Sequence, residues 1–264
     1  MDTIGIIGTG FMGSSLAGAI RTQHPDITIG IVEKDSHKRA AAVRDFSATD
    51  YTGDPAALLR DSQAVILAIK PQDLEAFAAL LPEREIDTPL ISVLAGTPTD
   101  RIAHTLNATA VVRIMPNLAA EIGRAVIGIT FPAAMSGEGR QEIRALLGGA
   151  GSLVEVEERL MSTITALSGS GIAFAFEFIN ALALGGVSEG LPYPQALRAA
   201  SDVVASAAAV LESTQVHPQE MISRVCSPAG TTIAGVQALA EGRFQATVMD
   251  AVQKSAQRSR ALEG

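Results

Sequence analysis

The chain has 264 residues, of which 47% are hydrophobic and 18% charged, and this composition excludes an intrinsically disordered protein. Its formal net charge of −8 argues against binding to nucleic acid, which needs a basic surface for the phosphates. The single cysteine, Cys226, cannot form an internal disulfide, and we therefore expect a soluble protein of the reducing cytoplasm.

The first half of the chain alternates short apolar runs with longer helical patterns. Six runs are rich in β-branched residues and mostly apolar on both faces, which is typical of strands in a parallel sheet covered by helices. The expected strands are Thr3–Ile7, Ile27–Val32, Ala64–Ala68, Leu90–Val93, Ala110–Ile114 and Ala125–Thr130. The chain opens on the first of these and not on a basic segment followed by an apolar one, so no signal peptide is expected. The alternation predicts a doubly wound α/β domain with a mostly parallel sheet over residues 1–157.

The second half, residues 158–264, is expected to be all-α. No further strand is predicted after an acidic run, Glu155, Glu157 and Glu158, that we interpret as solvated surface. The expected helices are Arg159–Leu167, Gly171–Glu189, Tyr193–Ser213, Pro218–Cys226, Thr231–Glu241 and Phe244–Leu262. The most apolar stretch, Ile172–Leu184, is predicted to be too short to span a bilayer, so no contact with a membrane is expected.

Several of these helices carry small apolar residues around most of their circumference, as in Ala199–Leu211. A helix that is apolar on most sides must be covered. This pattern favours an interwoven homo-oligomer over a tight monomeric bundle.

A glycine-rich turn follows the first expected strand. The segment Gly8-Thr9-Gly10-Phe11-Met12-Gly13 has the G-x-G-x-x-G spacing and leads into an amphipathic helix. In this context Gly8 makes the tight turn, Gly10 lets the backbone approach a pyrophosphate, and Gly13 lets the helix pack closely on the strand. The N–H groups at the helix start then bind the phosphates. The motif predicts a dinucleotide site.

The residues that close the second expected strand bear on the choice of dinucleotide. Glu33 is placed to accept hydrogen bonds from ribose hydroxyls, which favours NADH. Lys34, His37, Lys38 and Arg39 follow at once and could bind the 2′-phosphate of NADPH or simply start a solvated helix. The choice between NADH and NADPH stays open.

Two later strands end in similar segments. Ala68-Ile69-Lys70-Pro71-Gln72 lies at the sheet edge where open α/β sheets bind ligands, and Pro71 redirects the chain so that Lys70 lies at the rim of that crevice. Arg113-Ile114-Met115-Pro116-Asn117 repeats the pattern.

Two small-residue segments stand out in the helical half. The first, Ala166-Leu167-Ser168-Gly169-Ser170-Gly171, is interpreted as a turn. The second, Cys226-Ser227-Pro228-Ala229-Gly230-Thr231-Thr232, enters a helix at Thr231, where free N–H groups and hydroxyls could bind a carboxylate. Simple helix capping by these hydroxyls is the alternative. The four histidines are scattered without the spacing of metal ligands, so no metal site is expected.

Together these segments resemble the pyrroline-5-carboxylate reductase family over essentially the full chain. The matching segments are Ile6–Gly13, Ala68–Gln72, Arg113–Asn117, Ala166–Gly171 and Val225–Gly235. The resemblance implies reduction of the cyclic imine 1-pyrroline-5-carboxylate to L-proline with NADPH or NADH. It also implies an N-terminal Rossmann-type domain and a C-terminal helical dimerisation domain that forms homodimers, which in several members assemble into decamers.

The resemblance implies roles for individual residues. Ser227, Gly230, Thr231 and Thr232 would hold the carboxylate and ring nitrogen of a cyclic imino acid, with Thr232 as hydrogen-bond partner or proton donor at that nitrogen. Lys70 is the second catalytic candidate. The residues expected around the dinucleotide are Gly8, Thr9, Gly10, Phe11, Met12, Gly13, Glu33, Lys34, Ala68, Ile69, Lys70, Pro71, Ala95, Gly96, Met115 and Asn117.

The chain departs from the usual family pattern at several positions. Leu118 and Ala119 replace Thr and Pro, Ile172 and Phe174 replace Pro and Tyr, and Ala229 replaces a glycine. These departures motivate two alternatives, a reductase of another cyclic imine and a nucleotide-binding paralogue without strong catalysis. A 3-hydroxyacid dehydrogenase shares the glycine-rich opening, but it needs a catalytic lysine in an inter-domain helix that contains none here.

Overall fold

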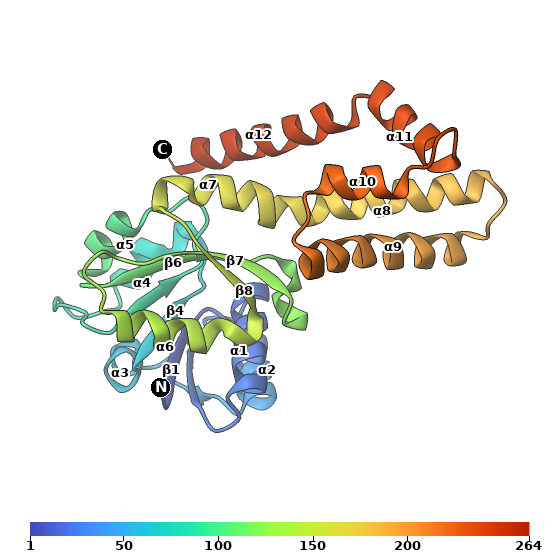
Figure 1. The fold of residues 1–264 in the computed structure, drawn as a ribbon. Coiled ribbons are helices and arrows are strands. Elements are labelled where there is room, and N and C mark those ends of the chain that lie inside the picture. The colour runs from blue at the N-terminus through green and yellow to red at the C-terminus, as the bar shows by residue number, and fades with distance from the viewer. Residues whose placement is uncertain (264) are drawn as a thin grey trace. The chain divides into compact units, whose positions relative to one another are not determined.

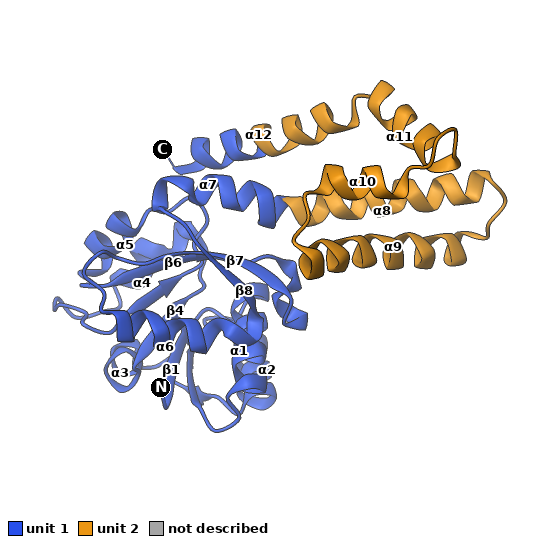
Figure 2. Ribbon diagram, in the orientation of Figure 1, with its two compact units in different colours: residues 1–170, 255–264 blue, residues 171–254 orange. Residues whose placement is uncertain are grey.

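The computed structural model describes residues 1–263, and contacts divide the chain into two compact units (Figure 2). Unit 1 contains residues 1–170 and the chain from residue 255 on, and unit 2 is Gly171–Lys254. The domain boundary expected at residue 157 stays a prediction. Contacts divide the chain later because the segment after residue 157 packs on the sheet: Ile164 is buried and lies so close to Gly128 that a Cβ there would come within 2.6 Å of its side chain.

Unit 1 is built on an eight-stranded sheet with the order β3-β2-β1-β4-β5-β6-β7-β8 (Figure 1). All neighbouring strands are parallel except β6 and β7, so the expected mostly parallel sheet is confirmed. The strands are β1 (Thr3–Ile7), β2 (Thr28–Val32), β3 (Thr49–Asp50), β4 (Ala64–Leu67), β5 (Leu90–Ser92), β6 (Val111–Met115), β7 (Ala125–Thr130) and β8 (Gly151–Glu155). Only β3 and β8 were not predicted.

Both faces of the sheet are covered, which explains the unbroken apolar runs of the central strands. On one face, Ile66 of β4 belongs to the same buried cluster as Leu16 and Ile20. On the other face, its neighbour Leu67 lies in a second cluster with Leu58. All five side chains are fully buried.

Short helices and turns connect the strands of unit 1. They are α1 (Phe11–Gln23), α2 (Ser36–Phe46), α3 (Pro55–Asp61), η1 (Pro71–Asp73), α4 (Leu74–Ala78), α5 (Thr99–Leu106), η2 (Leu118–Ile122), α6 (Gly137–Leu147), η3 (Gly148–Ala150), η4 (Glu158–Leu160) and α7 (Met161–Ile164). Four begin with a side-chain cap typical of helix starts: Asp35 caps α2, Asp54 caps α3, Asn117 caps η2 and Ser136 caps α6.

Unit 2 is helical, as predicted. Its helices are α8 (Gly171–Ser188), α9 (Tyr193–Thr214), α10 (Pro218–Val225), α11 (Thr231–Glu241) and α12 (Phe244–Glu263), the last of which ends in unit 1. The breaks fall where glycine and proline predicted them. Gly190, before Pro192, has a φ of +101°, a left-handed conformation that glycine adopts without strain.

The predicted turn at Ser168–Gly171 is wrong. Residues Thr165–Ser170 form a π-helix, η5, that continues directly into α8. The hydroxyls of Thr165 and Ser168 bond to the carbonyls of Met161 and Ile164, each four residues earlier, and such bonds let serine and threonine stay in a helix. The helix therefore passes through a segment whose composition is typical of a turn.

One helical stretch among the described residues, Glu158–Ser188, is long and apolar enough to cross a membrane, with a mean hydropathy of 1.5. The apolar stretch Ile172–Leu184, predicted to be too short to span a bilayer, lies inside this longer helix, which continues on both sides of it. A stretch of this kind is equally typical of an interface between protein subunits.

The described part of unit 2 has almost no core of its own. Its buried apolar side chains are Ala183, Ala196 and Ala200, where α8 packs on α9. Larger apolar side chains are exposed, and Phe176 and Val203 each expose more than half of their surface. In the single chain the helices of unit 2 therefore expose an apolar surface, which another protein surface has to bury.

Candidate active site

The three glycines of the turn between β1 and α1 have different structural roles. Gly8 has a φ of +92°, and a Cβ there would lie 2.7 Å from the Ala68 carbonyl oxygen. A Cβ on Gly13 would lie 2.0 Å from the carbonyl oxygen of Gly8, so both glycines are required by the fold. Gly10 has nothing within 4 Å of such a Cβ, and no side chain caps the start of α1. Free backbone N–H groups and open space at a helix N-terminus fit the pyrophosphate of a dinucleotide.

Glu33, at the end of β2, is tied to this turn. Its side chain is buried, and Oε2 accepts hydrogen bonds from the Thr9 N–H at 2.7 Å and the Thr9 hydroxyl at 3.1 Å. Oε1 accepts from the Asp35 N–H at 2.9 Å. The Glu33 carboxylate therefore holds the glycine-rich turn through these hydrogen bonds. Its predicted contact with a ribose remains a prediction.

A cavity of about 230 Å³ lies beside the glycine-rich turn. It opens at the carboxyl ends of β1, β2 and β4, where the chain order reverses across the sheet, which is the place where open α/β sheets bind nucleotides. The residues that line it are Ile7, Gly8, Gly10, Val32, Glu33, Lys34, Lys38, Ala68, Ile69, Lys70, Asp73, Ala76, Phe77 and Leu80. Seven of the predicted cofactor residues therefore lie around one cavity: Gly8, Gly10, Glu33, Lys34, Ala68, Ile69 and Lys70.

Charges of both signs surround this cavity. The Lys34 ammonium pairs with the Asp73 carboxylate at 2.9 Å, while Lys70 is exposed at the rim. The hydrogen bond from the Lys38 N–H holds the pKa of the Asp35 carboxyl below its ordinary value. Asp35 is therefore ionised at neutral pH and caps α2 as an anion.

Of the other predicted cofactor residues, five lie in the glycine-rich turn, at the start of α1 or in η1: Thr9, Phe11, Met12, Gly13 and Pro71. The last four, Ala95, Gly96, Met115 and Asn117, lie at the ends of β5 and β6. Asn117 is buried, donates from Nδ2 to the Ser168 carbonyl at 3.2 Å and accepts from the Ala119 N–H at 3.2 Å. This hydrogen bond brings two of the motif segments together, one after β6 and one in η5. Asn117 thus holds the backbone here, and its contact with the dinucleotide remains a prediction.

Sequence reasoning missed an ion cluster around a buried arginine beside these strand ends. Arg113 of β6 is 2% exposed and pairs with Glu158 and with Glu263. The interpretation of Glu158 as solvated surface is wrong, since its carboxylate accepts from Arg113 and from Thr99. The available signal was an arginine inside an apolar strand, because a buried arginine requires acidic partners.

The predicted substrate loop lies in unit 2, before α11. A Cβ on Gly230 would lie 2.2 Å from the Ser227 hydroxyl oxygen, which would then have to move. Ala229 has a φ of +55°, a conformation that favours the glycine usual in the family pattern. Gly230 is the N-cap of α11, without a side-chain cap, and Thr231 and Thr232 are exposed. Within residues 1–263 neither threonine hydroxyl has a hydrogen-bond partner, so both are free to bind a ligand.

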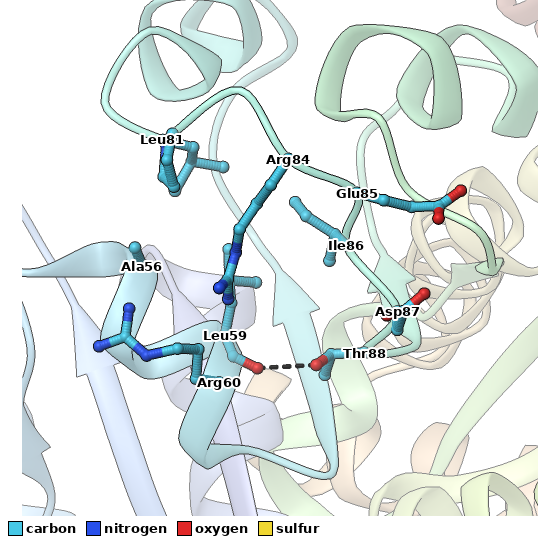
Figure 3. A pocket seen from close by; sticks show the side chains of 10 residues that line it. Ala56, Leu59, Arg60, Leu81, Arg84, Glu85, Ile86, Asp87 and Thr88 are labelled. Atoms are coloured by element: carbon cyan, nitrogen blue, oxygen red, sulfur yellow. Dashed lines mark hydrogen bonds between the residues drawn. The ribbon is translucent and has the colours of Figure 1, made fainter.

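A larger cavity of about 320 Å³ lies elsewhere, between the end of α3 and the segment before β5 (Figure 3). Arg60 and Arg84 line it, and the Thr88 hydroxyl closes its floor by donating to the Leu59 carbonyl at 2.7 Å. It lies at the amino ends of the strands and contains none of the predicted site residues. Over the described residues no cluster of three potential metal ligands occurs.

Comparison with known proteins identifies the family. Residues 158–262 match the family model described as pyrroline-5-carboxylate reductase dimerisation, and residues 3–96 match one described as NADP oxidoreductase, coenzyme F420-dependent. A pyrroline-5-carboxylate reductase of Aquifex aeolicus (strain VF5) is 36% identical over 260 residues, covering 98% of this chain and 97% of the relative. The chain belongs to the pyrroline-5-carboxylate reductase family.

Further relatives agree with this membership. A pyrroline-5-carboxylate reductase of Methanosarcina acetivorans is 37% identical and covers 98% of this chain, with 97% of its own length matched. A crystal structure of 1-pyrroline-5-carboxylate reductase from Streptococcus pyogenes superimposes with a TM-score of 0.86 at 30% identity, covering 98% of each chain. The predicted family, the Rossmann-type fold and the helical dimerisation region are confirmed, and the region is that of a homo-oligomer.

Proposed function

We propose that the chain reduces 1-pyrroline-5-carboxylate to L-proline with NADPH or NADH. The observation that carries this proposal is the full-length similarity to pyrroline-5-carboxylate reductases at 36% identity. The open helix N-terminus at Gly10 and the cavity between β1, β2 and β4 add a site that fits a dinucleotide.

The proposed reaction depends more on the orientation of the substrate than on acid–base catalysis. When bound, the reduced nicotinamide supplies the hydride for the imine carbon. A protonated imine is already electrophilic, so the protein has to align the substrate and manage one proton on its nitrogen. The N–H groups at the start of α11 and the Ser227 and Thr231 hydroxyls hold the substrate carboxylate. The Thr232 hydroxyl hydrogen-bonds the ring nitrogen, and Lys70 contributes positive charge at the crevice rim.

The substrate is tested directly by turnover. Purified protein is mixed with NADH or NADPH and a panel of five- and six-membered cyclic imino acids, and cofactor oxidation is followed at 340 nm. We expect the fastest oxidation with 1-pyrroline-5-carboxylate. Faster turnover of a six-membered ring would assign another cyclic imine, and dinucleotide binding without oxidation would indicate a paralogue without catalysis.

The cofactor preference follows from the charges around the cavity. Glu33 repels a 2′-phosphate, and Asp73 neutralises Lys34, one of the lysines that line the cavity, so we expect a higher kcat/KM with NADH than with NADPH. Asp73→Asn frees Lys34 and should raise the NADPH/NADH ratio of kcat/KM about fivefold, the effect of one charge–charge interaction of about 1 kcal/mol near a surface. Glu75→Gln, which removes an acid from the neighbouring α4, is the control and should leave the ratio unchanged. A clear NADPH preference in the wild-type protein would contradict this prediction.

The homo-oligomer is proposed to be a dimer formed through unit 2, and a decamer of five such dimers is the larger assembly that we propose. A cavity lined by Leu182, Leu191 and Val203 lies on the exposed side of α8 and α9, where an apolar partner surface fits. Val203→Glu would place a charge there, and we expect it to shift the light-scattering mass toward the monomer at micromolar concentration. Val43→Glu alters another exposed valine, on α2 of unit 1, and should leave the mass unchanged. A wild-type monomer at that concentration would contradict the proposal.

The proposed location is the cytoplasm, with a small-molecule imino acid as substrate and neither nucleic acid nor a membrane as partner. The single cysteine supports this location, and the negative net charge argues against a nucleic-acid partner. The apolar helical stretch Glu158–Ser188 is accounted for by the dimerisation region that it enters.

A further inference from the structure

The C-terminal end of α12 lies against the loop that follows β5. Its last turns belong to unit 1, as Figure 2 shows by colour. Gly96 of this loop has a φ of +65°, and a Cβ there would come within 2.8 Å of the Leu262 carbonyl oxygen. The backbones of the loop and of the chain end are therefore in direct contact.

The same chain end neutralises a buried arginine. The Arg113 Nη2 donates to Glu263 Oε1 at 2.7 Å, and its Nη1 donates to Glu158 Oε1 at 3.4 Å. Arg113 is 2% exposed, and its Nε is buried without a partner in the structure as described. A guanidinium in this position depends on its acidic neighbours, because an uncompensated buried charge is strongly unfavourable.

Glu158 links this cluster to the far end of the loop. It accepts from the Thr99 N–H at 2.7 Å and from the Thr99 hydroxyl at 2.6 Å, where α5 begins. Within the loop, Thr97 is almost completely buried, and its hydroxyl donates to the Ala95 carbonyl at 3.3 Å. The loop is thus held at Gly96 by Leu262 and at Thr99 by Glu158.

This loop lies at the carboxyl ends of the strands, on the side of the sheet where a dinucleotide would bind. It follows β5, whose parallel neighbour β4 ends in the segment that lines the cavity beside the glycine-rich turn. Ala95 at the tip of the loop is exposed, and it is one of the predicted cofactor residues.

We propose that Leu262 and Glu263 are positioning residues for the dinucleotide, acting through Gly96 and through the Arg113–Glu158–Thr99 cluster. The inference rests on the proposed function, since it assigns the chain end a part in cofactor binding. Without these contacts the β5–α5 loop populates conformations that do not bind. The apparent Kd then rises by the inverse of the binding-competent fraction.

The test compares Glu263→Gln and a chain ending at Ala261 with the wild-type protein. Dinucleotide affinity is measured by titration of nicotinamide fluorescence, and KM and kcat are measured at 340 nm. We expect the Kd and KM for the dinucleotide to rise about tenfold if the competent fraction falls to about a tenth, with kcat at saturating cofactor changed less than about twofold. Glu263→Asp keeps the carboxylate and should recover most of the affinity.

A matched control separates positioning from general stability. Glu155 bridges Arg140 and Arg144 in another ion cluster of unit 1, between α6 and β8, with no link to the β5–α5 loop. Glu155→Gln should leave the Kd unchanged. An equal rise in Kd in this control, or a normal Kd in both chain-end variants beside normal wild-type turnover, would overturn the inference alone. Failure of the wild-type protein to bind any dinucleotide would overturn the proposed function together with it.

Discussion

Replacement of Gly10 by valine is expected to abolish dinucleotide binding while the protein stays folded. The backbone at Gly10 has φ −67° and ψ −169°, an extended conformation open to any residue, and a Cβ there meets nothing within 4 Å. The valine side chain would instead fill the space where the phosphates meet the start of α1. We expect the Kd for NADH and NADPH to rise by at least about a hundredfold, equivalent to about 3 kcal/mol. Fluorescence titration measures the affinity, and thermal melting by circular dichroism measures the stability.

The neighbouring glycine provides the contrast. A Cβ on Gly13 would lie 2.0 Å from the Gly8 carbonyl oxygen, so Gly13→Val should lower the melting temperature or prevent folding. Gly10→Val should do neither. A folded Gly10→Val protein with wild-type affinity would remove the basis for the dinucleotide site at this turn.

Replacement of Thr232 by valine is expected to lower kcat roughly ten- to a hundredfold. Valine keeps the β-branched shape and removes the hydroxyl, and one hydrogen bond left unmade at the substrate nitrogen costs about 1–3 kcal/mol. The bond should strengthen as the imine nitrogen becomes an amine, so the loss falls on kcat more than on KM. The Kd for the dinucleotide, whose proposed site is in unit 1, should stay the same.

The structure distinguishes this catalytic role from a role of Thr232 in capping the helix. Gly230 is the N-cap of α11 and no side chain caps the helix, so Thr232→Val should leave the melting temperature unchanged. Thr247→Val is the matched control, because it removes a hydroxyl from an exposed threonine of unit 2 that bonds only to the Arg243 carbonyl. It should keep wild-type turnover. Full activity of Thr232→Val with a lowered melting temperature would refute the catalytic assignment.

The strands that the sequence predicts well are those buried on both faces. β1 and β7 match their predicted bounds. A strand covered by helices on both faces is apolar along its whole length, so the apolar run in the sequence marks where the strand begins and ends. The two unpredicted strands lie at the edges of the sheet. β3 has only two residues, and β8 is largely exposed and starts at Gly151, whose φ is +150°. Edge strands carry little of the hydrophobic pattern on which the prediction depends.

The candidate site also has parts that the sequence predicts and parts that it does not. The roles of Gly8 and Gly13 follow from local spacing, since both act within one strand–turn–helix unit. The pairing of Arg113 with Glu263 joins residues 150 positions apart, and no local pattern carries that information. The π-helix at Thr165–Ser170 was missed because serine and glycine have low helix propensity, which tertiary contacts such as the hydrogen bond from Asn117 to Ser168 override.

The three buried alanines of unit 2 have a consequence for how the active protein forms. Burial of three methyl groups contributes on the order of 1 kcal/mol each, so the exposed apolar side chains of α8 and α9 hold most of the apolar surface that unit 2 could still bury. In a homo-oligomer a second copy covers these side chains, so their burial is a bimolecular step. Its rate rises with the square of the chain concentration, and dilution lowers the active fraction as well as the amount. At chain concentrations near the dissociation constant of the oligomer, halving the concentration therefore removes more than half of the assembled protein.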